Sequence, residues 1–167
     1  MIQGRIWFFV FCSFVVVSCG TSHGAQSGEA AVSAEIVTYA EPMPAKDWDE
    51  DVIDGRHRVR SRDRKAFIVG GMVNNGLNPS PELFLDGFTD GRAMGKSKPV
   101  PADVVSRMNA DAGSIVDFPD ADDKAFSLTD IAIKKGSNMY VLVIRFPTGK
   151  MNYRNALLKH AYSLKFN

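Results

Sequence analysis

The segment KDWDEDVIDGRHRVRSRDRK, from Lys46 to Lys65, places its charged residues at regular intervals of two. Neighbouring side chains of a β-strand point to opposite faces of a sheet, so an interval of two places residues on one face. Aspartates follow this interval at positions 47, 49 and 51, and five arginines follow it afterwards: Arg56, Arg58, Arg60, Arg62 and Arg64. The segment therefore predicts two consecutive strands, each with one strongly charged face.

The dipeptide Asp54-Gly55 lies between the two charged sets. It is a preferred two-residue hairpin turn, because both residue types tolerate positive φ. A hairpin closed at this turn predicts the cross-strand pairs Ile53–Arg56, Asp51–Arg58, Asp49–Arg60, Asp47–Arg62, Val52–His57, Trp48–Ser61 and Lys46–Asp63. Each directly opposed pair of opposite charges contributes about 0.2–1 kcal/mol. A shift of one residue would break every pair, so the charges specify the register.

Apolar and alternating segments predict further strands. They are Glu35–Tyr39, Ala66–Val73, Phe126–Ile133, Met139–Phe146 and Tyr162–Phe166. The third and fourth of these flank a turn that contains Gly136, so we expect them to form a hairpin. The pair Gly70-Gly71 inside the second segment predicts a bulge or a bend there.

Helix signals are fewer. Pro101–Ala112 begins with proline and ends before a glycine, as a short helix does. Asn152–Ala161 is ambiguous between helix and strand. The sequence therefore predicts a mainly β fold: a single antiparallel β-sandwich-like domain with one or two short helices, over residues 35–167.

The N-terminal residues have a different composition. Met1–Arg5 carries one positive charge, and Ile6–Ser18 is an uncharged apolar run. This run is shorter than the roughly 20 residues that a membrane-spanning helix requires. A positive start followed by a short apolar segment is typical of a secretory signal peptide. The segment ends in Val16-Val17-Ser18-Cys19-Gly20, and the only other cysteine, Cys12, lies inside the apolar run.

This ending resembles the lipobox of bacterial lipoproteins. The resemblance implies that residues 1–18 are a signal peptide and that Cys19 becomes the lipidated first residue, carrying a diacylglycerol and an amide-linked acyl chain such as palmitate. It also implies a location in the bacterial cell envelope. Glycine rather than aspartate at position 20 implies, in a Gram-negative host, anchoring in the outer membrane facing the periplasm. An ordinary signal peptide with a chance cysteine is the alternative.

Residues 19–34 are predicted to form the lipidated cysteine and a flexible tether, because the stretch after Cys19 is rich in Gly, Ser and Ala and has no apolar periodicity. Removal of residues 1–18 would leave no second cysteine, so no internal disulfide is possible. It would also remove one basic residue, Arg5, which leaves equal numbers of basic and acidic residues. A neutral chain has no overall field that attracts nucleic acid, so nucleic acid is not an expected partner.

The titratable residues form no recognisable catalytic pattern. The sequence Gly20–Gly24 matches G-x-S-x-G, but it lies in the predicted tether rather than at a strand-to-helix turn. His23, His57 and His160 have no paired spacing, so we expect no metal site and no cofactor. Aspartates that we interpret as loop residues, with calcium binding as the alternative, are Asp86, Asp90, Asp117, Asp120, Asp122 and Asp123.

A second resemblance concerns the folded part. Asn78-Pro79-Ser80-Pro81 leads into Leu83-Phe84-Leu85, and a turn with Gly136 leads into Tyr140-Val141-Leu142-Val143. This order is similar to the small β-sandwich outer-membrane lipoprotein of type VI secretion systems. The resemblance implies a role in tethering that machine to the outer membrane. The charged hairpin and the Asp-rich segment 117–123 depart from the family's pattern.

Three functions are compatible with these features. The first is a non-enzymatic lipoprotein whose domain binds another envelope protein, as an assembly subunit or an inhibitor. The second is a module that binds an anionic envelope ligand through the hairpin arginines. Arg56 and Arg64 have no carboxylate opposite them in the predicted register and are the better candidates. The third is a hydrolase in which His57 or His160 meets several of the aspartates only in the folded chain.

The lipid anchor leads to the first prediction. Replacing Cys19 with alanine is expected to release the protein from the membrane fraction, because each buried methylene contributes about 0.8 kcal/mol and two or more acyl chains anchor stably. Fractionation of cells that produce each form measures this. A Cys19→Ala protein that stays with the membranes would contradict lipid anchoring at this residue.

Overall fold

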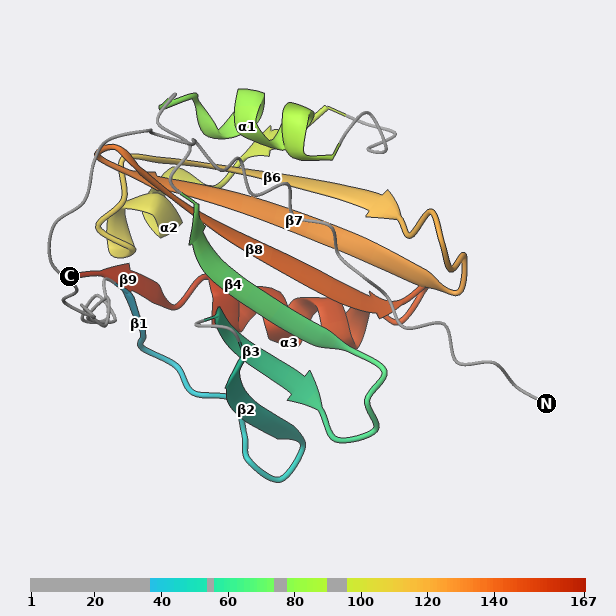
Figure 1. Cartoon of the computed structure of the whole chain (residues 1–167). Helices are drawn as coiled ribbons and strands as arrows, with labels where there is room; N and C mark the ends of the chain where they lie inside the picture. Colours follow the sequence, from blue (N-terminus) through green and yellow to red (C-terminus); the bar gives the residue numbers. More distant parts are fainter. Residues whose placement is uncertain (1–36, 54–55, 74–77, 90–95) are drawn as a thin grey trace, which may run out of the picture. The chain divides into compact units, whose positions relative to one another are not determined.

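Seven antiparallel strands form one large sheet in the order β2-β3-β4-β8-β7-β6-β5 (Figure 1). The strands are β2 (Trp48–Ile53), β3 (Arg56–Ser61), β4 (Phe67–Val73), β5 (Lys98–Pro99), β6 (Ala112–Pro119), β7 (Phe126–Lys135) and β8 (Asn138–Pro147). A separate two-stranded sheet pairs β1 (Val37–Tyr39) with β9 (Leu164–Phe166). Every pairing among the described strands is antiparallel, and hairpins connect β2 to β3, β3 to β4, β6 to β7 and β7 to β8.

This computed structural model describes residues 37–53, 56–73, 78–89 and 96–167. The predicted signal peptide, Cys19 and the tether lie outside the described residues, as do His23, Asp90 and the hairpin turn Asp54-Gly55. All of the described residues belong to one compact unit.

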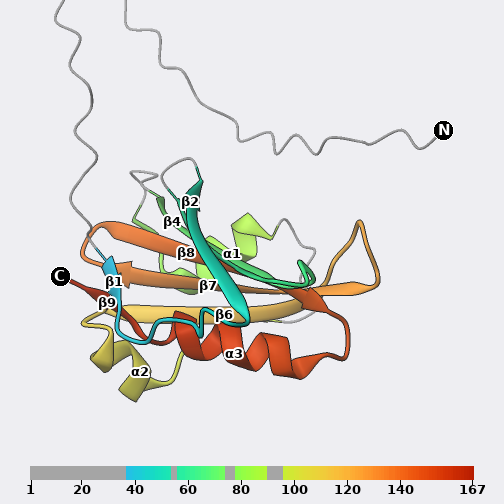
Figure 2. The same ribbon diagram turned by 90° about the horizontal axis from the view of Figure 1, so that it is seen from below.

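Helices cover the two faces of the large sheet (Figure 2). Helix α3 (Met151–Ala161) and helix α2 (Ala102–Arg107) pack on one face, which we call the α3 face. Helix α1 (Pro81–Phe88) packs on the opposite face, the α1 face, over β6 and β7. The sandwich-like layering therefore combines one large sheet with helices and the small β1–β9 sheet.

The larger core lies on the α3 face. Its fully buried side chains come from the sheet, from α2 and α3 and from β9, and they include Val59, Ile68, Met108, Ile131, Leu142, Ile144, Leu157 and Leu164. Arg154 fastens α3 to the sheet, because its Nε and Nη2 donate to the two carboxylate oxygens of Asp117, each at 2.9 Å. A smaller core on the α1 face surrounds Leu85, which is fully buried.

The mainly β antiparallel fold that the sequence predicts is confirmed, and the hairpin of β7 and β8 turns at Gly136 as expected. The expected bulge at Gly70-Gly71 is wrong, because β4 pairs with β8 without interruption from Phe67 to Val73. A Cβ atom at Gly70 would lie 2.6 Å from Leu142 Cδ2. The glycine therefore provides space for a core leucine.

Two other expectations are corrected. Three helices lie in the described residues, and α1 was not expected from the sequence. Its signal is local: the Ser80 side chain caps the helix by accepting from Leu83 N, and Pro81 begins it. The loop interpretation of two aspartates is also wrong. Asp86 lies in helix α1, and Asp117 lies in strand β6. The ambiguous segment at the C-terminus is helix α3.

Candidate functional site

The charged hairpin has the register that the sequence predicts. Strands β2 and β3 pair Trp48 with Ser61, Asp49 with Arg60, Asp51 with Arg58, Val52 with His57 and Ile53 with Arg56. The two outermost expected pairs lie beyond the strands. There the backbone N–H of Arg62 still donates to the carbonyl oxygen of Asp47, at 3.0 Å.

The arginine row is shorter than expected. Arg56, Arg58 and Arg60 lie on strand β3, whereas Arg62 and Arg64 lie in the turn that follows it. Arg64 has a φ of 60°, which is incompatible with a strand. Asp63 causes this change of direction, because its carboxylate accepts from Ser61 Oγ at 2.7 Å and from Lys65 N at 3.1 Å. The five arginines therefore do not share one strand face.

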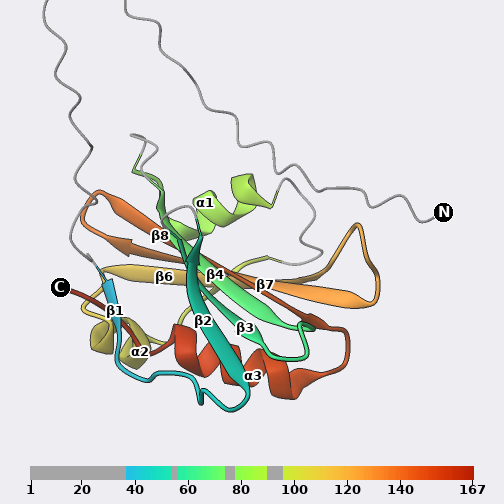
Figure 3. The same cartoon turned by 60° about the horizontal axis from the view of Figure 1, so that its bottom comes forward.

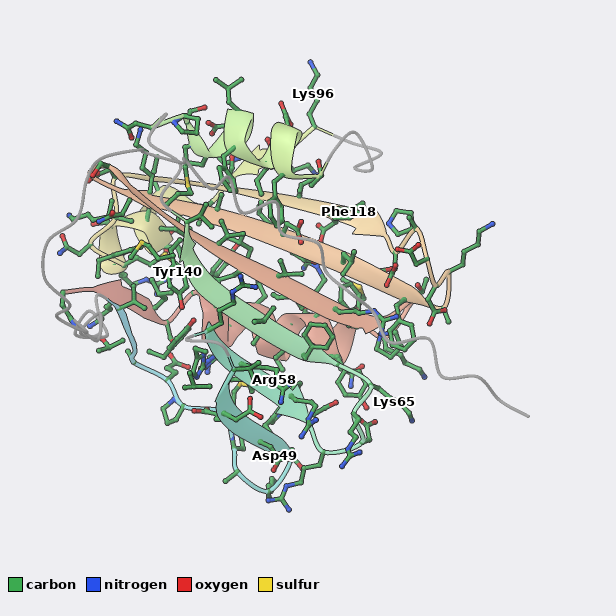
Figure 4. The ribbon with its side chains drawn as sticks, in the orientation of Figure 1. Asp49, Arg58, Lys65, Lys96, Phe118 and Tyr140 are labelled. Atoms are coloured by element: carbon green, nitrogen blue, oxygen red, sulfur yellow. The ribbon has the colours of Figure 1, made fainter. Side chains whose placement is uncertain are left out.

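The ion pairs of the hairpin follow the register only in part. Arg58 donates to both carboxylate oxygens of Asp51, which lowers the pKa of Asp51. Asp49, directly opposite Arg60, instead forms its ion pair with Arg62, at 3.5 Å. As a result Arg60 Nε is buried without a hydrogen-bond partner. Strand β3 places Arg58 closer to the centre of the sheet than Asp49 on the edge strand β2 (Figure 4).

The arginines on β3 also cover apolar surface. Arg58 is directly opposite Val69, and Arg60 is directly opposite Phe67, on a part of the sheet that α1 does not cover. Both arginines are half-buried. The aliphatic stems of arginines can shield apolar side chains while their charged ends stay near water. The row therefore has a structural role whether or not it binds a ligand.

Arg145 pairs with two carboxylates of the Asp-rich segment 117–123. Arg145 Nε donates to Asp120 Oδ2 at 2.8 Å, and its Nη2 donates to Asp123 Oδ2 at 3.3 Å. Its guanidinium carbon lies 3.6 Å from the centre of the Phe126 ring. Within the described ranges, no three His, Cys, Asp or Glu side chains come close enough together to hold a metal ion.

A cluster of aromatic and histidine rings lies on the α3 face. Tyr39 on β1 stacks between His57 and His160, with ring centroids 4.5 and 4.4 Å apart, and its hydroxyl lies 3.4 Å from that of Tyr140. Glu50 Oε2 lies 3.7 Å from His57 Nε2. Burial raises the pKa of Tyr39 and lowers that of His160. Among the described residues, none of the aspartates noted in the sequence joins this cluster.

The histidines are brought together by strand β1, and no sequence spacing indicates their meeting. His160 is 2% exposed, its Nδ1 lies 2.8 Å from the carbonyl oxygen of Glu41, and its Nε2 has no hydrogen-bond partner. This cluster fixes β1 and the residues after it to helix α3. Within the stack His160 is buried, whereas Tyr39 and His57 are partly exposed.

One buried carboxyl was missed by sequence reasoning. Asp130 on β7 is 3% exposed, and its Oδ1 has no hydrogen-bond partner. It faces the α1 side of the sheet between Val116 and Val143, its cross-strand neighbours. Burial raises its pKa to about 7. The sequence signal for this buried carboxyl is an aspartate at a position of an alternating strand that faces the core.

Two open grooves lie beside helix α3. The larger, with a volume of about 570 Å³, is bounded by α2, α3, β9 and the residues after β1, and it is lined by Ala40, Glu41, Arg107, Asn155, Leu158, Lys159, Tyr162, Ser163, Leu164 and Lys165. The second lies between the base of the hairpin and α3. There the Tyr153 hydroxyl donates to Asp63 Oδ2 at 2.6 Å, and this bond is the main reason that the pKa of Asp63 falls to about 2.

No helix among the described residues is long and apolar enough to cross a membrane. No protein-family model matches the sequence, and no curated protein matches it. Among solved structures, the chain is similar to a crystal structure from Bacteroides thetaiotaomicron VPI-5482, with 13% sequence identity and a TM-score of 0.45. The match covers 75% of this chain and 43% of that chain, so the chain spans less than half of that protein's length.

The hairpin geometry leads to a double-mutant prediction. Exchanging the charges of Asp51 and Arg58 singly is expected to destabilise the protein, and exchanging both should recover about 0.5–1 kcal/mol, because this pair is directly opposed and hydrogen-bonded. The same cycle on Asp49 and Arg60 is the control and should recover less. Urea unfolding of the variants measures both cycles. Equal coupling in the two cycles would contradict the ion pairing described here.

Asp130 leads to a prediction about pH. Its pKa of about 7 in the folded state lies above the ordinary value of 3.8, so the folded state retains a proton that the unfolded state loses. Stability should therefore fall as pH rises from about 4 to about 7, by about 4 kcal/mol in total.

Urea unfolding across this pH range tests the assignment. Asp130→Asn cannot ionise, so it should remove most of the decline and be more stable than the wild type at pH 8. The exposed Asp122→Asn is the matched control and should keep the wild-type profile. An unchanged pH dependence in Asp130→Asn would show that this carboxyl is not the cause.

Proposed function

We propose that the chain is a lipid-anchored protein of the bacterial envelope whose folded domain binds another envelope protein. The observation that supports this best is the position of its exposed apolar side chains. Val52 and Ile53, 69% and 40% exposed, are the last two residues of strand β2 before the hairpin turn. Leu83 and Phe88, 67% and 39% exposed, lie on helix α1. Val52 shares the α3 face with its cross-strand partner His57, and Ile53 points to the opposite face of the sheet.

Large exposed side chains of this kind are costly in water and are common anchors of protein interfaces. Leu83 and Phe88 form no part of the two cores. Phe88 stacks on Phe84, with ring centroids 5.6 Å apart, so the aromatic side of α1 is ordered before a partner arrives. An ordered apolar surface loses less entropy on binding than a flexible one. The partner is either an assembly, as in the type VI resemblance, or an enzyme that the domain inhibits.

A second candidate function is supported by Arg60. Its Nε is buried without a partner, and within the described part of the chain no carboxylate lies within ion-pair distance of its side chain. An anionic ligand would satisfy this group. Arg58 and Arg62 contribute less charge to such a ligand, since both already pair with aspartates.

Site-specific photo-crosslinking in intact cells tests the leading proposal. A photoreactive residue at Leu83 or at Val52 is expected to form a discrete crosslink to one envelope protein. The same residue at Met151, which is 48% exposed at the start of α3, is the matched control and should form none. In a second variant, Leu83→Asp is combined with the photoreactive residue at Val52. If both positions contact one partner, this change should reduce the crosslink from Val52 at least tenfold.

Equal crosslinking from all three positions would indicate random collisions in the envelope and would contradict a specific interface. The absence of any crosslink from Leu83 and Val52 would contradict the proposal directly. The lipid anchor should be kept in every form, because it sets the local concentration at the membrane.

A further inference from the structure

The larger groove on the α3 face combines positive charge with an apolar floor. Its rim carries three cations and one carboxylate: Arg107, Lys159, Lys165 and Glu41. Helix α2, the C-terminal end of α3 and strand β1 lie at the same end of the domain (Figure 3), and with β9 they supply its walls. On the hairpin, by contrast, Arg58 and Arg62 already pair with aspartates.

The existing ion pairs of the groove are replaceable. Lys159 Nζ lies 2.7 Å from Glu41 Oε2, and Arg107 Nη2 lies 3.3 Å from Asp103 Oδ2. All four side chains are more than half exposed, and exposed pairs of this kind contribute little to stability. Within the described residues, Lys165 has no carboxylate within ion-pair distance. A ligand with a stronger negative charge could therefore pair with these cations, because little stability is lost when the existing ion pairs break.

The floor of the groove is apolar. Leu158 and Tyr162 are half-buried side chains of the α3 end, and Leu164 is fully buried beneath them. A small inorganic anion would leave this surface in contact with water. A ligand with a charged head and an adjoining apolar part would cover it, and burial contributes about 25 cal/mol per Å² of apolar surface. The chemistry of the groove therefore fits an amphiphilic anion.

The groove is also near the predicted lipid anchor in the sequence. Ala40 and Glu41, which line it, directly follow β1, the first described strand. About twenty residues separate them from Cys19, which corresponds to roughly 25 Å for a random coil at 5–6 Å × √n. If Cys19 is lipidated, as in the proposed function on which this step rests, the groove lies within reach of lipid headgroups.

We propose that this groove binds the headgroup and glycerol region of an anionic phospholipid in the membrane that holds the lipid anchor. Arg107 and Lys165 contact the phosphate, and Lys159 joins them when it leaves Glu41. Leu158 and Tyr162 contact the apolar carbons next to the ester groups. Binding in this way fixes the domain on the bilayer in one orientation, which a flexible tether alone does not do.

The test uses purified protein carrying Cys19→Ala, so that no acyl chain contributes to binding. Sedimentation with phosphatidylcholine vesicles containing 30% phosphatidylglycerol, against phosphatidylcholine alone, measures the part that depends on anionic lipid. The double variant Arg107→Gln with Lys165→Gln should lower this binding roughly tenfold to thirtyfold, since each cation near an anionic surface contributes about 1 kcal/mol. Both side chains are exposed, so the fold should be unaffected.

The matched control is Arg60→Gln with Arg62→Gln, which makes the same change in charge on the hairpin. It should alter vesicle binding by less than twofold. An equal loss in both double variants would mean nonspecific attraction and would overturn the proposal, and a loss in the hairpin variant alone would assign the lipid to the arginine row. Unchanged thermal unfolding of both variants excludes misfolding as the cause.

A second measurement tests the apolar floor. Dihexanoyl phosphatidylglycerol below its micelle concentration should bind the groove at least tenfold more tightly than glycerol 3-phosphate, as followed by chemical shifts of Leu158 and Tyr162. Equal affinities would mean that only a free phosphate group is recognised and would contradict the lipid proposal. The groove variants should leave crosslinking at Leu83 unchanged, so a failure here is distinguishable from a failure of the proposed protein interface.

Discussion

Burial of strand β8 on both faces is the constraint on which the rest of the domain depends. Its side chains from Met139 to Leu142, and again Ile144 and Phe146, are almost completely buried. A strand in this position requires a partner on each edge and a cover on each face. Strands β4 and β7 supply the edges over seven and ten paired residues. The α3 face receives α3 and α2, and the α1 face receives α1 over only part of its width.

The incomplete cover of the α1 face explains the half-buried arginines. Beyond the reach of α1, the sheet continues through β4 to the hairpin, and Phe67 and Val69 would otherwise face water. Arginines on β3 lie directly opposite these residues and shield them with their aliphatic stems. The aspartates of β2 then balance the arginine charges at the sheet edge and discourage pairing with another chain. The arginine side chains of the hairpin thus cover the part of the α1 face that α1 does not reach.

The parts of the fold that the sequence predicts are those specified by local chemistry. The hairpin register follows from a two-residue turn and alternating charges, and the strand β8 follows from an apolar run. Helix α1 was missed although Ser80 and Pro81 are its start signal, because its eight residues include Gly87 and two phenylalanines. The candidate sites depend on residues far apart in the chain. Tyr39 meets His160, and Glu41 meets Lys159, across more than a hundred residues, and no spacing encodes such contacts.

The α1 part of the proposed partner surface and the proposed lipid groove lie on opposite faces of the large sheet. Leu83 and Phe88 belong to α1, and the cationic groove belongs to α2, α3 and β9 on the other face (Figures 2 and 3). A domain bound to the bilayer through the groove would turn α1 away from the membrane. The apolar side chains of α1 would then be presented to a partner in the aqueous compartment rather than to the lipid, because the sheet itself separates the two contacts. The charge of the groove and the exposure of α1 are therefore consistent with both proposals.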